Sequence, residues 1–194
     1  IDTDEIKRIT KEFTVQQLED VVYSVLKEYR KWAQMSYEWK EARDSSLKQL
    51  QFPFSQYRHG QRQLAVAVYK SIRERDRLFA CAPTGIGKTM STVFPSLKAM
   101  GENLTDKVFY LTAKTVTAVA ANDAIGIIYD KMPDIALKAL TVTAKDKVCF
   151  LEKRKCDPIS CPYAKNYFDK VNDVLYNSLQ QNNVFSRELI EKIA

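Results

Sequence analysis

The sequence predicts an α/β fold in which helices cover a parallel β-sheet. Apolar segments suited to strands alternate with amphipathic segments suited to helices. The expected strands cover residues 78–82, 107–112 and 139–143, and the helices between them cover residues 88–99 and 115–129. Strands that alternate with helices at this spacing favour a parallel sheet, because each helix returns the chain to the edge where the next strand starts.

Further helices are expected on both sides of this sheet. Before it, apolar residues recur at spacings of three, four or seven, at Leu18, Val22, Val25, Tyr29, Trp32 and Trp39. This period draws one apolar stripe along a helix, which we expect to serve packing rather than chemistry. Thr14 and Gln17 match a capping box at the start of that helix. Other helices are predicted over residues 60–73 and 163–179, and Ser186 is a candidate cap for a last one.

The composition is typical of a soluble globular protein. Of its 194 residues, 45% are hydrophobic and 28% are charged. No apolar run approaches the roughly 20 residues that a membrane helix needs, and the first residues do not match a signal peptide. We therefore expect a cytoplasmic protein with no membrane partner. The net charge of +6 is mild and favours an anionic partner without specifying one. The chain does not begin with Met, so we expect a piece of a longer protein.

The strongest motif is a glycine-rich loop, Ala-Pro-Thr-Gly-Ile-Gly-Lys-Thr, at residues 82–89. Its glycines allow a tight turn whose backbone N–H groups point at phosphate oxygens. Lys88 offers a positive charge to the terminal phosphates and Thr89 offers a hydroxyl to Mg²⁺, so these two are the candidate catalytic residues. The expected ligand is ATP, held by the loop residues Thr84, Gly85, Ile86, Gly87, Lys88 and Thr89.

A second element lies upstream of the loop, at Tyr57, Arg58 and Gln61. An aromatic ring can stack on a purine, and the Gln61 amide can both donate to and accept from an adenine edge. We expect these three residues to complete the nucleotide site. His59, the single histidine, is interpreted as a surface or packing residue.

Polar residues follow two of the expected strands, at the edge where a parallel sheet binds its ligands. Thr112, Lys114 and Thr115 follow one strand, and Lys145 ends a second Thr-Ala-Lys triplet after the next. Hydroxyls and cations suit a sugar-phosphate backbone, so we expect these four residues to contact DNA. For either triplet alone, a capped helix start is an equally good explanation.

The cysteines form the last candidate site. Cys149, Cys156 and Cys161 are spaced C-x6-C-x4-C, which fits an iron–sulfur cluster better than a zinc site. Zinc ligation and unligated thiols both stay open on spacing alone. Cys81 is expected to be a small core residue in a buried strand beside the glycine-rich loop.

Together these motifs resemble the XPD/DinG family of superfamily 2 iron–sulfur DNA helicases, most closely the bacterial DinG-like branch. The matching segments are Phe52-Pro53-Phe54 with Tyr57, Arg58 and Gln61, then Ala82 to Thr89, Phe109 to Thr117, Thr143-Ala144-Lys145 with Cys149, and Cys161 to Lys165 running into Val171-Asn172-Asp173. Many phosphate loops begin with glycine, but this loop begins with Ala82. A loop that begins with alanine is the form typical of such helicases.

The resemblance implies an ATP-driven helicase that moves 5′ to 3′ on single-stranded DNA and opens forked DNA. It implies a partial RecA-like P-loop NTPase sheet, with an N-terminal helical segment at residues 1–50. The front half of the first motor domain would occupy residues 51–146, and the start of an inserted iron–sulfur domain would occupy residues 147–194. It also implies a 4Fe–4S cluster, three of whose ligands would be Cys149, Cys156 and Cys161. The fourth ligand, the Mg²⁺-binding carboxylates and the second motor domain have no match, so we expect this piece to bind ATP without turning it over.

Two other classes stay open on the sequence. One is a P-loop kinase or ATPase with a structural zinc site, and the other is a non-catalytic DNA-binding piece. The intact Lys88-Thr89 pair disfavours the second of these, because a loop that has lost its function usually loses its lysine.

The metal content of the protein tests the cysteine assignment. We expect anaerobically purified protein to contain iron and sulfide, and Cys156→Ser to lower both while Cys81→Ser leaves them unchanged. Thiolates bind the cluster iron directly, so removing one ligand weakens the site. Zinc in place of iron and sulfide would favour the kinase or ATPase class instead.

Overall fold

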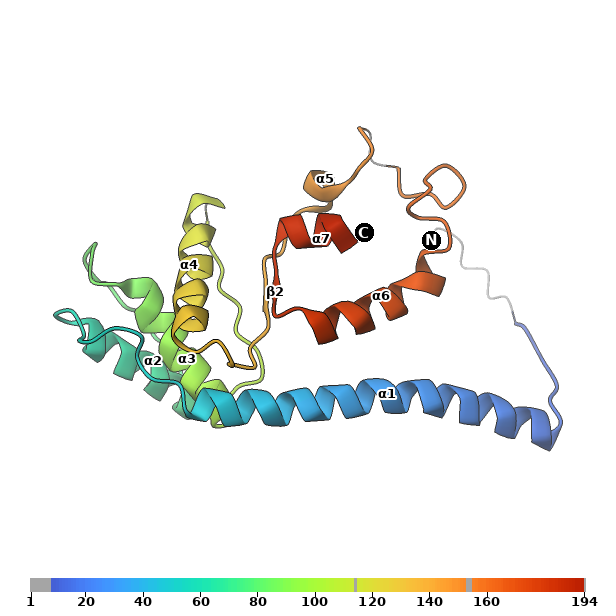
Figure 1. The fold of residues 1–194 in the computed structure, drawn as a ribbon, viewed down its shortest axis with the longest axis horizontal. Coiled ribbons are helices and arrows are strands. Elements are labelled where there is room, and N and C mark those ends of the chain that lie inside the picture. The colour runs from blue at the N-terminus through green and yellow to red at the C-terminus, as the bar shows by residue number, and fades with distance from the viewer. Residues whose placement is uncertain (1–7, 114, 153–154, 194) are drawn as a thin grey trace. The chain divides into compact units, whose positions relative to one another are not determined.

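The computed structural model describes residues 8–113, 115–152 and 155–193 of the chain. The chain divides by its internal contacts into two units, residues 1–38 and residues 39–194, and Figure 1 labels the helices and strands. Helix α1 (Val15–Lys48) begins in the first unit and ends in the second. Among the residues described here, no helix combines the length and apolar character that would let it cross a membrane.

The first unit contains the beginning of α1. The predicted capping box is confirmed at its start: the Gln17 amide donates to Thr14 Oγ1 at 3.2 Å, and the Thr14 amide donates to Gln17 Oε1 at 3.0 Å. These two bonds satisfy backbone donors that the first turn of a helix leaves unpaired. The sequence alone therefore locates the start of this helix.

The second unit is built mainly of helices. After the end of α1 come α2 (Gln61–Glu74), α3 (Lys88–Gly101), α4 (Thr115–Lys131), β1 (Ala139–Leu140), α5 (Lys145–Val148), α6 (Tyr167–Gln181), β2 (Val184–Phe185) and α7 (Arg187–Ile193). The predicted helices over residues 60–73, 88–99 and 115–129 correspond to α2, α3 and α4. Ser186 caps α7 as predicted, since its Oγ accepts from the Leu189 amide at 3.3 Å.

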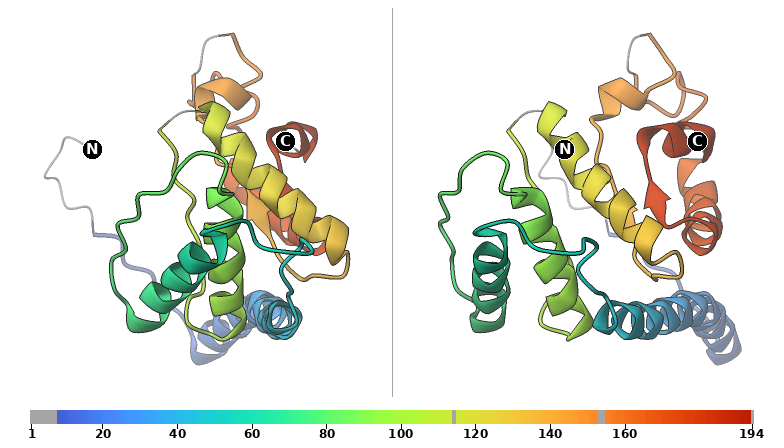
Figure 2. Two further views of the ribbon diagram at one scale, coloured as in Figure 1. Left: turned by 90° about the vertical axis from the view of Figure 1, so that its left-hand side faces the viewer. Right: turned by 60° about the vertical axis from the view of Figure 1, so that its left-hand side comes forward.

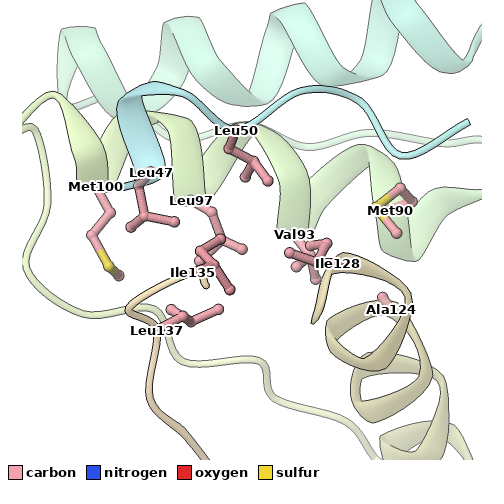
Figure 3. Close-up of a cluster of buried hydrophobic side chains, with 10 residues drawn as sticks. All are labelled: Leu47, Leu50, Met90, Val93, Leu97, Met100, Ala124, Ile128, Ile135 and Leu137. Atoms are coloured by element: carbon pink, nitrogen blue, oxygen red, sulfur yellow. The ribbon is translucent and has the colours of Figure 1, made fainter. Parts of the chain in front are cut away.

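Helix α3 lies at the centre of this unit, with α2 on one side and α4 on the other (Figure 2). Its apolar residues meet those of the end of α1, of α4 and of the segment after α4. The buried cluster consists of Leu47, Leu50, Met90, Val93, Leu97, Met100, Ala124, Ile128, Ile135 and Leu137 (Figure 3). Burial of apolar area is the main force that holds these helices together, at about 25 cal/mol per Å².

The end of α1 is fixed to the rest of the unit by polar contacts as well. The buried Arg43 donates through Nε to Asp44 at 2.7 Å and through Nη1 to the Asp106 carbonyl at 3.2 Å. Lys98 of α3 donates to the Lys48 carbonyl at 2.6 Å, which satisfies a backbone acceptor at the end of α1. These bonds hold the final turns of α1 against α3.

The predicted RecA-like parallel sheet is wrong. In the described residues the strands are β1 and β2, each of two residues, which pair in parallel as Ala139↔Val184 and Leu140↔Phe185. Residues 78–82 and 107–112 form no strand, and the side chains of Phe79 and Leu111 are 93% and 88% exposed. A strand is stable only where a neighbour satisfies its N–H and C=O groups. Here the apolar core is enclosed by helices, which satisfy their own backbone groups.

Two helical glycines provide a matched test of this packing. A Cβ on Gly101 of α3 would lie 2.8 Å from the backbone and Cβ of Leu47, whereas a Cβ on Gly126 of α4 would meet no atom within 4 Å. We expect Gly101→Ala to lower the free energy of unfolding by about 1–3 kcal/mol through overpacking. Gly126→Ala should raise it by roughly 0.5–1 kcal/mol, because alanine favours the helix. Urea denaturation of both variants measures the difference, and equal effects would contradict the close approach of α1 and α3.

Candidate functional site

The glycine-rich loop connects the extended segment after α2 to the first turn of α3. Gly85 and Gly87 have φ angles of 83° and 84°, in the left-handed region that glycine adopts without strain. Gly87 is the residue that precedes α3, which begins at Lys88. The unpaired N–H groups of this first turn and the positive end of the helix dipole make this point suited to an anion.

Gln61, the first residue of α2, supports the loop from behind. Its side chain is buried, and its Oε1 accepts from the Arg58 amide at 3.0 Å while its Nε2 donates to the Gly87 carbonyl at 3.4 Å. A Cβ on Gly87 would lie only 2.3 Å from Gln61 Nε2. The amide therefore fixes the turn that starts α3, and the contact with adenine that its sequence position suggests stays a prediction.

Arg58 forms the second link between this element and the loop. Its Nη1 donates to the Gly85 carbonyl at 2.6 Å. Gly60 approaches the loop as well, because a Cβ there would lie 2.9 Å from Ile86 Cδ1. Together with the Gln61 bond to Gly87, the segment that leads into α2 thus contacts three consecutive residues of the loop, although 27 positions separate Arg58 from Gly85.

An open pocket of about 670 Å³ lies between these two segments. Its walls are residues 58–60, residues 81–86 and three side chains of α2, which are Gln63, Leu64 and Ala67. Pockets of roughly 300–1,000 Å³ with an apolar lining and a few polar groups are typical of small-molecule sites. Here the polar groups include the Arg58 guanidinium, the Gln63 amide and the loop backbone.

Lys88 bends back onto its own loop. Its Nζ donates to the carbonyls of Ala82 at 3.2 Å and Pro83 at 2.9 Å, and the side chain is exposed. Hydrogen bonds from an ammonium to phosphate oxygens are stronger than those to neutral carbonyls. An incoming phosphate group can therefore replace the two carbonyls as the partner of Lys88. Thr89 follows in the first turn of α3, half-buried.

Tyr57 does not line the pocket but packs against Phe52. Its ring stacks on Phe52 with centroids 3.8 Å apart and an interplanar angle of 17°, and Phe52 in turn meets Phe94 of α3 edge-on. Burial raises the pKa of the Tyr57 hydroxyl. The ring thus joins the aromatic cluster beside α3, and the pocket is lined by neither Tyr57 nor Gln61.

The four residues expected to contact DNA do not follow neighbouring strands of a parallel sheet in the described part of the chain, so no sheet edge brings them together. Thr112 is half-buried at the end of an extended segment, and Lys145 is the exposed first residue of α5. Lys114 lies outside the described residues, and α4 begins at Thr115. Their grouping was inferred from neighbouring parallel strands, which are absent from residues 107–112. The DNA contacts therefore stay predictions for each residue separately.

The three clustered cysteines are not gathered into a ligand set. Cys149 is half-buried, Cys156 is exposed, and Cys161 is buried in a turn where its amide donates to the Asp157 carbonyl at 2.8 Å. Within the described residues, no three His, Cys, Asp or Glu side chains come together as metal ligands would. The described residues therefore show no assembled ligand set, the 4Fe–4S cluster stays a prediction, and we derive no step of the function from one.

The pocket also contains residues that the sequence analysis missed. Cys81 was expected in a buried strand, but it is exposed and lines the pocket, because residues 78–82 form no strand. Gln63 and Leu64 lie one helical turn before Ala67 on α2, and this spacing was a signal for a shared face. What the sequence did not reveal is that this face lies opposite the glycine-rich loop.

Comparison with known proteins identifies no relative. No protein-family model, no curated protein and no solved structure matches the chain. The function is therefore inferred from the loop, from the pocket beside it and from the sequence motifs.

The two loop glycines provide a test of the support from Gln61. Alanine at either position must adopt a left-handed conformation, which costs about 1–2 kcal/mol. Only Gly87→Ala also displaces the Gln61 amide, whereas a Cβ on Gly85 would meet no atom within 4 Å. We expect Gly87→Ala to lower the free energy of unfolding by a further 1–3 kcal/mol or so, the cost of unpaired buried amide groups. Urea denaturation distinguishes the two variants, and equal losses would show that Gln61 does not hold the turn.

Proposed function

We propose that this chain binds ATP with Mg²⁺ through residues 82–89, as the nucleotide-binding part of an ATP-dependent DNA helicase. The observation that carries the proposal is the start of α3. There, two left-handed glycines, the free N–H groups of a helix N-terminus and the Lys88 ammonium come together at one exposed point. Binding of an anion is the function that best explains this combination.

The phosphate groups are the part of the nucleotide that the geometry explains best. The negative charge of the β- and γ-phosphates is favoured at the positive end of α3, by interactions of roughly 0.3–1 kcal/mol for an exposed helix terminus. Lys88 leaves the carbonyls of Ala82 and Pro83 to bind phosphate oxygens. Thr89, one residue further, supplies a hydroxyl for Mg²⁺, as in other loops of this pattern.

In this proposal the nucleoside part lies in the open pocket between α2 and the loop. This pocket is continuous with the loop, because residues 81–86 form one of its walls. Leu64 and Ala67 offer apolar contact for a base, and Arg58 lies where the pocket meets Gly85. A bound base would thus contact α2 directly, while Gln61 acts on the nucleotide through Gly87.

The assignment to a helicase rests on the sequence. It is supported by the resemblance of residues 50 to 194 to iron–sulfur DNA helicases and by the net charge of +6. In this proposal ATP binding at the loop is coupled to 5′-to-3′ movement on single-stranded DNA. Thr112, Lys114, Thr115 and Lys145 are the residues proposed to contact the sugar-phosphate backbone.

Lys88→Ala tests nucleotide binding at the loop. We expect it to weaken ATP binding on the order of tenfold to hundredfold, the loss of charge-assisted hydrogen bonds worth roughly 1.5–3 kcal/mol. The control is Lys70→Ala, which removes the same charge from an exposed position of α2. Titration calorimetry gives both dissociation constants. Equal affinities for the two variants would refute the role of the loop.

The same variant tests the assignment to a helicase. Single-stranded DNA should stimulate ATP hydrolysis by the helicase of this proposal, and Lys88→Ala should abolish that stimulation. ATP binding without any stimulation by DNA would leave the nucleotide site intact and overturn the helicase assignment.

A further inference from the structure

The first part of α1 carries an apolar face that is exposed from Val15 to Tyr29. Leu18, Val22, Val25 and Tyr29 are 52%, 48%, 62% and 67% exposed. With the exposed Val15 before them and the half-buried Trp32 after them, they follow the alternating spacing of three and four residues that defines the seam of a coiled coil. Val21 and Leu26, also exposed, widen the same face.

Such a face is costly to leave in water. In the first unit, residues 8–14 precede α1 without forming a helix or strand, so the described part of this unit offers no second element to cover the seam. Helices draw most of their stability in proteins from packing of an apolar face rather than from intrinsic propensity. Contiguous exposed apolar surface of this kind marks an interaction site.

We propose that this seam pairs with the same seam of a second copy of the chain, in antiparallel orientation. A two-fold interface requires a surface that is complementary to itself. The seam meets this condition about a point between Val22 and Val25. In this register, Val22 faces Val25 of the second copy, Leu18 faces Tyr29, and Val15 faces Trp32. Larger side chains near one end thus meet smaller ones from the other end, which suits close packing.

The charges beside the seam favour the same orientation. Glu19 and Arg30 lie on one edge of the apolar face, near its opposite ends. An antiparallel pair brings Glu19 of each copy close to Arg30 of the other, which gives two ion pairs. On the other edge, Glu28 is already neutralised by Lys31 of the same helix at 2.9 Å. Antiparallel helices also place opposite ends of their dipoles together.

Two neighbouring substitutions test whether the seam forms a dimer. We expect the protein to dimerise with rising concentration, as measured by light scattering and sedimentation equilibrium. Val22→Asp places a charge in the seam and should weaken the dimer on the order of a hundredfold. Tyr23→Asp is the matched control, because it adds the same residue one position away, outside the seam. A monomer at all concentrations, or equal weakening by both variants with unchanged helical circular dichroism, would overturn the proposal.

A charge exchange tests the orientation. Glu19→Arg and Arg30→Glu should each weaken the dimer by roughly threefold to tenfold, because each places like charges together. The double variant should recover the original affinity, since the exchanged charges again meet as opposites across an antiparallel pair. If the double variant is weaker than either single variant, the helices do not pair in this antiparallel register.

Discussion

The burial of α3 is the constraint on which the rest of the second unit depends. The end of α1, helix α2 and helix α4 all pack against it, and the apolar core comes from α3, the end of α1, α4 and the segment after α4. Gly101 allows α1 to approach α3 to a distance at which any side chain would clash. Because α3 is fixed at its C-terminal end and along its length, its N-terminus is fixed as well.

The candidate site follows from this fixed N-terminus. The turn that precedes α3 requires a left-handed residue, and Gly87 supplies it. Gln61 then ties that turn to the start of α2, so two packed helices determine where the N–H groups of the loop lie. Only Lys88 is held weakly, by two carbonyls of its own loop. In the proposed function the packed parts of the site would bind phosphate through the backbone N–H groups and the helix dipole, and Lys88 would exchange its two carbonyl partners for phosphate oxygens.

Local signals in the sequence predicted the helices and the loop well. Thr14 and Gln17 located the start of α1, Ser186 the start of α7, and the glycines and Lys88 the start of α3. Each of these signals depends on residues within a few positions of one another.

The sheet failed because strand formation depends on partners distant in the sequence, which a single apolar segment does not reveal. The pocket shows the same limit. The sequence placed Cys81 in a core, and it did not show that Gln61 would support the loop rather than face a base. Such features depend on which helix packs opposite which loop. Cys149, Cys156 and Cys161 are close in the sequence, but their spacing did not show that they would fail to form one group in the structure.

The most direct test of the central claim is the dependence of affinity on the number of phosphates. Binding of ATP, ADP, AMP and adenosine can be measured by titration calorimetry at one Mg²⁺ concentration. If the N-terminus of α3 and Lys88 bind the terminal phosphates, affinity must fall from ATP to ADP and again to AMP, with adenosine weakest. Equal affinity for ATP and adenosine would show that the pocket binds the nucleoside alone and would contradict the account.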